Sequence, residues 1–283
     1  MRLFLLVALT MTAFAANSVL NRAALASGGI DAVSFGTLRL LSGALMLAAL
    51  VMVREGRLKF GGSGRLAGVA GLFLYIYGFS AAYAGMPAGL GALLLFGMVQ
   101  VTMFGGSVAG GERVPAQRWL GAGLAFGGLV WLLWPGGQAA PSLPHALAML
   151  LAGVGWGVYS LAGRKAEVAL VSTAANFVLA AGLGLVVLLA LQLAGAGGPW
   201  SPGAVALAVL SGAVTSGLGY ALWYAVLPQL PGSVAAVAQL TVPVIAMAGG
   251  MVFLGEALTA RFSLAALLVL GGVAVSVAPL RRG

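Results

Sequence analysis

The chain has 283 residues, of which 61% are hydrophobic and only 7% are charged, and it contains no cysteine. Soluble globular proteins have about 45–50% apolar and about 25% charged residues, so these proportions exclude a soluble domain and a disordered chain. The absence of cysteine excludes disulfide scaffolds and thiolate metal sites. The net charge is +9, but the basic residues lie in short gaps between apolar runs, which is typical of membrane topology signals and not of nucleic-acid binding. The composition therefore predicts an all-α, multi-pass membrane protein.

Ten apolar runs predict ten transmembrane helices, because each span needs about 20 apolar residues. In chain order, the predicted spans are 3–26, 32–53, 66–84, 88–109, 119–134, 146–163, 168–193, 203–227, 233–254 and 262–278. Glycine and proline punctuate the short connections. The first run also resembles a cleavable signal, with a candidate cleavage site at 13–16, but the repeat described below needs this helix and we expect it to be retained.

The lysines and arginines predict the orientation of the chain. With the N-terminus inside the cell, eleven of the fourteen fall in cytoplasmic segments: Arg2, Arg54, Arg57, Lys59, Arg65, Arg113, Arg118, Arg164, Lys165, Arg281 and Arg282. Only Arg22 and Arg261 fall outside, and Arg39 lies within a span. By the positive-inside rule, we expect both termini in the cytoplasm and the protein in the inner (plasma) membrane.

The two halves of the chain are similar when one is shifted by 144 residues. The shift places Pro87 on Pro231, Glu112 on Glu256, Gly127-Gly128 on Gly271-Gly272 and Pro135 on Pro279. It divides the chain into repeats at residues 1–138 and 139–283. Each repeat has five predicted helices, so the second repeat must enter the membrane from the opposite side. Inverted repeats are typical of secondary transporters, whose substrate site lies near the midplane between the repeats.

Two motifs at span ends add a family resemblance: Leu-Gly-Glu at 254–256 and Trp-Gly…Arg-Lys at 156–165. With the ten helices in two halves, they make the chain resemble the drug/metabolite transporter superfamily, within it the EamA-type exporters, and in particular the YddG-type aromatic amino-acid exporters of bacteria. The resemblance implies that the first, third, fourth, sixth, eighth and ninth helices line the pathway. This family often has a proline inside both the fourth and the ninth helix. Pro243 is present, but its counterpart is Val99, so a symmetric hinge is not expected in the fourth helix.

Charged groups inside spans are costly and therefore candidates for function. Arg39 lies about eight residues into its span and could face the pathway, but we favour an arginine that snorkels or caps a neighbouring helix end. Glu112 and Glu256 lie at span ends and could gate, although pairing with a nearby arginine such as Arg113 or Arg261 is favoured. No acid or histidine lies near the middle of a span, which favours transport without strict proton coupling. The lack of central cations disfavours phosphorylated substrates.

Aromatic and amide side chains supply the candidate substrate site. Two helices carry aromatic stripes, one with Tyr75 and Phe79 and the other with Trp223, and these either pack helices together or line a cavity. Their symmetric placement favours a cavity, while the amides could bind substrate or neighbouring helices. The candidate substrate-binding residues are Asn17, Tyr75, Phe79, Tyr83, Met98, Gln100, Trp156, Tyr159, Trp223 and Gln239. The candidate hinge or gating residues are Pro87, Pro231, Pro243, Glu112 and Glu256.

These features predict a secondary transporter that exports neutral amino acids, aromatic ones and other apolar or small ones, with related small metabolites, by alternating access. An exporter of other metabolites or drugs is the alternative within the same class. A channel is a further alternative that is disfavoured, because a selective pore would show rings of like residues from several subunits or repeats. A membrane-embedded enzyme is disfavoured because the spans supply no His/Asp/Glu cluster and no nucleophile–base pair. We expect no cofactor, no metal and no nucleic-acid partner; the expected partners are the substrate and the lipid bilayer, and the protein could act as a monomer.

Overall fold

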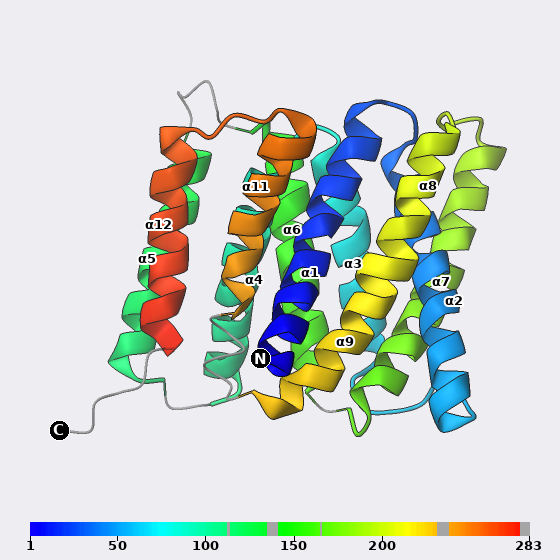
Figure 1. Cartoon of the computed structure of the whole chain (residues 1–283), viewed down its shortest axis with the longest axis horizontal. Coiled ribbons are helices and arrows are strands. Elements are labelled where there is room, and N and C mark those ends of the chain that lie inside the picture. The colour runs from blue at the N-terminus through cyan, green and yellow to red at the C-terminus, as the bar shows by residue number, and fades with distance from the viewer. Residues whose placement is uncertain (112–113, 135–140, 165, 231–237, 278–283) are drawn as a thin grey trace.

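A computed structural model describes residues 1–111, 114–134, 141–164, 166–230 and 238–277. Over these residues the regular structure is helical and no β-strand forms (Figure 1). The helices are α1 (Arg2–Ala26), α2 (Ala32–Glu55), α3 (Arg65–Tyr83), α4 (Ala88–Ala109), α5 (Ala116–Leu133), α6 (Leu143–Gly163), α7 (Ala169–Leu193), α8 (Pro202–Leu210), η1 (Ser211–Leu218), α9 (Gly219–Val226), η2 (Leu227–Gln229), α11 (Thr241–Leu254) and α12 (Ala260–Val277).

Seven helical segments of the described chain are long and apolar enough to cross a membrane. They are α1, α2, α3, α4, α6, α7 and the continuous segment Pro202–Gln229, while α11 and α12 are shorter apolar helices. The helices begin within three residues of the predicted spans, except α11, whose predicted start at 233 lies outside the described residues. The prediction of an all-helical, multi-pass membrane protein is therefore confirmed.

Helix ends follow the local chemistry of the chain. The carboxylate of Asp31 caps α2 by accepting hydrogen bonds from the backbone N–H groups of Val33 and Ser34, each at 2.9 Å. Burial acts to raise the pKa of Asp31, but the hydrogen bonds from Ser34, Gly198 and Val33 outweigh it and hold the pKa below its ordinary value. The contact with Gly198 ties the α1–α2 connection to the α7–α8 connection at one end of the bundle.

The helices stand side by side in an elongated bundle (Figure 1). The pair α5 and α12 forms one edge, α2 and α7 pack together at the other, and α1, α3, α4, α6 and α11 lie between. At the α5–α12 crossing, a Cβ atom added to Gly272 would lie 2.6 Å from the carbonyl oxygen of Gly121. Such close backbone approach between small residues is the usual way in which membrane helices associate.

This crossing can be tested with a matched pair of glycines on α5. We expect Gly121→Val to lower the midpoint of thermal unfolding in detergent, because overpacking typically costs about 1–3 kcal/mol. Gly127→Val is the control, since nothing lies within 4 Å of a Cβ atom at that position. Equal midpoints for the two variants would show that α5 and α12 do not pack closely at Gly121.

The predicted span 203–227 is interrupted by a π-helix, η1, that the hydropathy pattern does not reveal. Its Ser211, Thr215 and Ser216 are all buried and face polar groups of α1 and α2. Gly212 makes this approach possible, because a Cβ atom there would collide with the hydroxyl of Ser42 on α2. Single turns of π-helix occur frequently at functional sites. The polar groups of α1 and α2 that contact η1 in the membrane interior are therefore candidates for a functional site.

Candidate functional site

A cavity of ≈ 790 Å³ lies between α4, α5, α6, α9 and α12, a size typical of small-molecule sites. It extends to the end of the bundle at which the N-terminus lies (Figure 1). There it is lined by Ser107 near the end of α4, Arg118 near the start of α5, and Arg164 after α6. Both arginines are exposed, and none of the cavity's described lining residues is an Asp, Glu or His. The cavity mouth is therefore positively charged.

The inner wall of the cavity is aromatic. It is formed by Trp156 and Tyr159 of α6 together with Tyr220, Trp223 and Tyr224 of α9. The ring centroids of Trp156 and Tyr220 are 5.3 Å apart, and those of Trp156 and Tyr159 are also 5.3 Å apart. Rings at this spacing present broad apolar faces that suit flat or apolar ligands.

A second, smaller hollow of ≈ 20 Å³ lies behind this wall. Trp156 and Tyr220 line both spaces, so this ring pair separates them. The remaining lining residues of the hollow are Phe14, Asn17, Ser18, Tyr75, Phe79, Leu95 and Phe96. The small hollow, lined mainly by α1, α3 and α4, thus lies directly behind two side chains of the aromatic wall.

A buried polar network borders this hollow. The side-chain oxygen of Asn17 accepts hydrogen bonds from the hydroxyls of Ser211 at 2.8 Å and Thr215 at 2.5 Å, both on η1. Asn21 donates to the backbone oxygen of Asn17 at 2.8 Å and accepts from Ser80 at 3.2 Å. The amides of α1 thus connect to η1 and α3 through partners that are themselves inside the bundle, so their polar groups are largely satisfied.

Arg39 corrects an expectation from the sequence. It neither snorkels nor caps a helix end, because its side chain is 0% exposed in the middle of α2. Its Nε donates to the hydroxyl of Ser216 and one terminal nitrogen donates to the hydroxyl of Tyr75, each at 3.0 Å. The guanidinium also lies 4.9 Å from the ring centre of Phe79 and 5.2 Å from that of Tyr75. The membrane interior therefore contains a central cation, contrary to the prediction.

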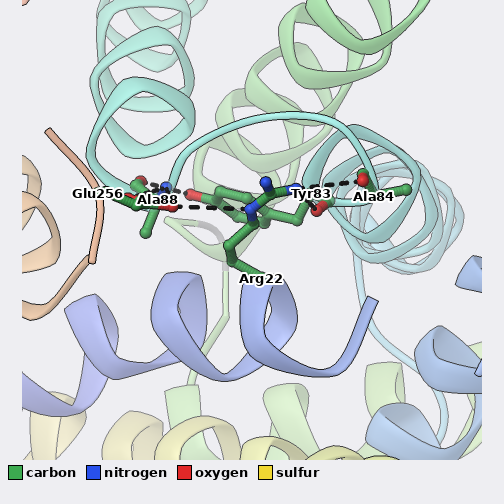
Figure 2. Close-up of polar contacts among 5 residues, drawn as sticks. All are labelled: Arg22, Tyr83, Ala84, Ala88 and Glu256. Carbon is green, nitrogen blue, oxygen red and sulfur yellow. Dashed lines mark hydrogen bonds and ion pairs between the residues drawn. The ribbon is translucent and has the colours of Figure 1, made fainter. Parts of the chain in front are cut away.

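The opposite end of the bundle is closed by contacts among α1, α3, α4 and the segment after α11 (Figure 2). Both carboxylate oxygens of Glu256 accept from the backbone N–H of Ala88, the first residue of α4, at 2.9 and 2.8 Å. Arg22 lies 3.6 Å from the same carboxylate and donates to the carbonyl oxygens of Tyr83 at 3.2 Å and Ala84 at 3.1 Å. A carboxylate at a helix N-terminus is stabilised by the free N–H groups and the helix dipole.

Glu256 therefore pairs with Arg22. Arg261 was predicted from the sequence as its partner, so that expectation is wrong. Arg261 instead donates to the carbonyl oxygens of Trp131 and Trp134. Burial raises the pKa of Glu256, and the hydrogen bond from Ala88 and the charge of Arg22 offset this only in part. We call the group formed by Arg22, Tyr83, Ala84, Ala88 and Glu256 the α4 latch.

The structure gathers most of the predicted site residues in three places, namely the cavity, the small hollow and the α4 latch. Gln100, Trp156, Tyr159, Trp223 and Gln239 line the cavity, and Asn17, Tyr75 and Phe79 line the small hollow together with Trp156. Tyr83 and Glu256 belong to the α4 latch, which Pro87 adjoins as the residue before α4. Met98 packs near Gly153 outside both spaces, and Pro243 is buried in the first turn of α11. Glu112 and Pro231 lie outside the described residues.

Several residues of this site were not among the predicted ones. Tyr220 lies in the same aromatic stripe as Trp223, so the sequence carried a signal by which it could have been predicted as a site residue. Arg39 was noticed as an ionisable group within a span, but its partner Ser216 lies 177 residues away and cannot be inferred from spacing. Phe14 falls on Trp156 when the first helix is shifted by 142 residues, and this repeat signal could have selected it. No group of acidic or histidine residues that could hold a metal ion occurs in the part of the chain that the structure describes.

A multi-pass helical bundle with a ligand-sized cavity open at one end and closed at the other is typical of membrane transporters. A model of the EamA-like transporter family matches residues 143–278. The uncharacterized protein PA1977 of Pseudomonas aeruginosa is 49% identical over 282 residues, which cover 98% of this chain and 95% of that protein. A solved crystal structure with 22% identity has a similar fold, with a TM-score of 0.62 over 94% of this chain and 96% of the other. The chain belongs to the EamA-like transporter family of the drug/metabolite transporter superfamily.

Proposed function

We propose that this protein exports neutral amino acids, aromatic ones and other apolar or small ones, together with related metabolites, by alternating access. The observation that carries the proposal is the one-sided cavity with an aromatic inner wall. Trp156, Tyr220 and Trp223 offer ring faces to a flat or apolar side chain, while Gln100 and Gln239 offer amides to polar groups. The α4 latch closes the other end, as alternating access requires of a state that is open on one side.

An inverted repeat of residues 1–138 and 139–283 is part of this proposal. The helix contacts support it because they occur in matching pairs. In the proposed repeat, α6 is the counterpart of α1, and α3 and α4 both pack on α6. Their own counterparts, the segment of η1 and α9 and the helix α11, both pack on α1. The pairs α2–α7, α4–α11 and α5–α12 each join a helix to its own counterpart. Rocking of one repeat against the other would then move the opening from one end to the other.

The orientation follows from the positive-inside rule. The exposed arginines Arg54, Arg118 and Arg164 lie at the cavity end, as does the N-terminus. We therefore place the cavity mouth and the termini in the cytoplasm and the protein in the plasma membrane. In this orientation, the structure corresponds to an inward-open state that loads substrate from the cytoplasm, as an exporter must.

Transport is proposed to run down the substrate's own gradient. A proton-coupled carrier needs a titratable group along the path. The described residues that line the cavity and the hollow include no Asp, Glu or His. Glu256 is held in the α4 latch away from both spaces.

Counterflow in proteoliposomes tests the proposed function. We expect unlabelled phenylalanine, tyrosine or methionine inside the vesicles to drive uptake of labelled phenylalanine, with saturation and without an imposed pH gradient. A panel of amino acids, nucleosides and organic cations supplies the comparison. Competition by cations without competition by neutral amino acids would assign the protein to drug or other metabolite export. Flux that neither saturates nor shows counterflow would contradict a carrier and favour a channel.

A further inference from the structure

The guanidinium of Arg39 lacks a counter-charge. Its two hydrogen-bonded partners, Ser216 and Tyr75, are both neutral hydroxyls, and no carboxylate among the described residues contacts it. Its second terminal nitrogen, Nη1, is buried without any hydrogen-bond partner in the described chain. A buried charge without a paired charge is costly, and such groups are usually compensated by a partner or a ligand. The buried charge of Arg39 therefore lacks a compensating negative charge unless an anion binds nearby.

Two hydroxyl groups beside this charge are also available. The oxygen of Tyr75 accepts the hydrogen bond from Arg39, which leaves the tyrosine proton to be donated elsewhere. The hydroxyl of Tyr220 is buried and forms no well-aligned hydrogen bond with the described residues, and the hydroxyl of Tyr75 lies beside it. Both tyrosines line the small hollow, and Tyr220 also lines the cavity. Two tyrosines thus line a space that adjoins the aromatic wall, and the cation of Arg39 lies next to the hydroxyl of one of them, Tyr75.

We propose that the small hollow is the subsite for a carboxylate of the substrate. Tyr75 and Tyr220 would donate hydrogen bonds to the carboxylate oxygens, while Arg39 supplies the counter-charge from behind Tyr75. The side chain of the substrate would stay against Trp156 and Trp223 in the cavity. This inference rests on the proposed function and adds the chemical group by which the substrate is recognised.

The size and chemistry of the hollow favour a carboxylate over larger anions. Its ≈ 20 Å³ exceeds the roughly 10–15 Å³ that one water needs, so it admits one oxygen of a carboxylate but not a tetrahedral phosphate. Apart from Asn17 and Ser18 of α1, its remaining walls are the apolar rings and side chains of Phe14, Phe79, Leu95, Phe96 and Trp156. In such surroundings a hydrogen bond to a charged oxygen is stronger than in water. Arg39 touches the substrate only through Tyr75 in this scheme, so it is a positioning residue.

Competition by matched acids and amides tests the subsite. The probes are phenylalanine with phenylalaninamide, and 3-phenylpropionate with 3-phenylpropionamide, each competing with the substrate that shows counterflow in proteoliposomes. We expect each acid to compete about 10-fold or more better than its amide, as for a hydrogen bond to a charged group. Tyr220→Phe and Tyr75→Phe should each lower this acid preference about 10-fold with little change of shape.

The controls separate positioning from folding. Tyr77→Phe changes a tyrosine on the same helix whose hydroxyl pairs with Thr37 outside the hollow, and it should leave the acid preference unchanged. Arg39→Gln should abolish the preference, whereas Arg39→Lys, which keeps the charge, should retain part of it. The two tyrosine variants keep the test decisive if the Arg39 variants do not fold.

The outcomes distinguish this inference from the proposed function. If phenylalanine is transported but acids and amides compete equally in the unmodified protein, the carboxylate subsite is wrong and the transport function stands. If phenylalanine is not transported but 3-phenylpropionate competes better than its amide, and Tyr220→Phe removes the difference, the subsite stands and the amino-acid function is wrong. An acid preference that persists in both tyrosine variants would also overturn the subsite.

Discussion

Trp156→Ala is expected to weaken substrate competition in proteoliposomes by about 10- to 150-fold, because a buried aromatic contact contributes about 1.5–3 kcal/mol. Trp156 separates the cavity from the small hollow and its ring lies 4.9 Å from that of Tyr75 and 5.3 Å from that of Tyr220. Removing it therefore deletes the wall against which the substrate packs and disorders the rings beside it. Trp223→Ala should have a smaller effect in the same direction, since Trp223 lines only the larger cavity.

The matched control is Trp131→Ala on α5. The ring of Trp131 is 47% exposed and does not line either space, so its loss should leave competition unchanged. Thermal unfolding of each variant in detergent shows whether it is folded. Normal transport with the same ranking of substrates in both Trp156→Ala and Trp223→Ala would mean that these rings only pack helices together.

Glu256→Ala is expected to open the closed end of the bundle. The substitution leaves the N–H of Ala88 without its acceptor and Arg22 without its only carboxylate in the described chain. Unpaired groups of this kind cost about 1–3 kcal/mol, so the ratio of the closed to the open outer end should fall by about 5- to 150-fold. Spin labels on α1 and on the segment after α11 would measure this ratio as a change in their distance distribution.

Glu256→Gln should have a smaller effect than Glu256→Ala. Glutamine keeps one oxygen that can accept from Ala88, and its loss of the attraction to Arg22 is offset because no charge has to be buried. Gradient-driven flux should persist in this variant, with altered stability or rate. Glu55→Gln, at the exposed end of α2, is the control for loss of a surface carboxylate. The contradicting result would be that Glu256→Gln abolishes flux and that the unmodified protein transports only when a pH gradient is present. Glu256 would then take part in proton coupling.

The pH dependence of the latch has a defined sign. Burial raises the pKa of Glu256 in the closed state above the value of a solvated carboxyl. A state with the raised pKa binds a proton more tightly, so the closed outer end should gain stability relative to an open one as the pH falls through this range. The same spin-label distances, recorded from neutral to acidic pH, would show the closed fraction rising, and a falling fraction would contradict this assignment.

Hydropathy and punctuation predicted the helices because both depend on local sequence. The apolar runs locate α1 to α4, and Pro87 marks the start of α4, a helix boundary that the structure reproduces. The aromatic residues in the middle of the spans also included part of the cavity wall, since Trp156, Tyr159 and Trp223 line it. These residues lie on helix faces whose spacing can be read from the chain.

Contacts between distant segments could not be predicted in this way. Glu256 and Arg22 are 234 positions apart, and the nearby Arg261 was the more obvious partner until the helices were placed in space. The π-helix η1 has a composition that fits an ordinary helix, and its geometry depends on the close approach of Gly212 to α2. Arg39 was expected to snorkel or to cap a neighbouring helix end because arginine snorkels readily, whereas the folded bundle supplies Ser216 and Tyr75 as partners.

Labelling of a single cysteine at Ser160 tests the central claim most directly. Ser160 lines the cavity on α6, and the chain has no cysteine of its own. We expect Ser160→Cys to react with a membrane-impermeant thiol reagent from the cytoplasmic side only, and saturating substrate to slow the reaction. Gly61→Cys, in the exposed α2–α3 connection at the same end, should react from that side whether or not substrate is present. Reaction of Ser160→Cys from both sides at equal rates, or from outside alone, would contradict a cytoplasm-facing cavity that is closed by the α4 latch.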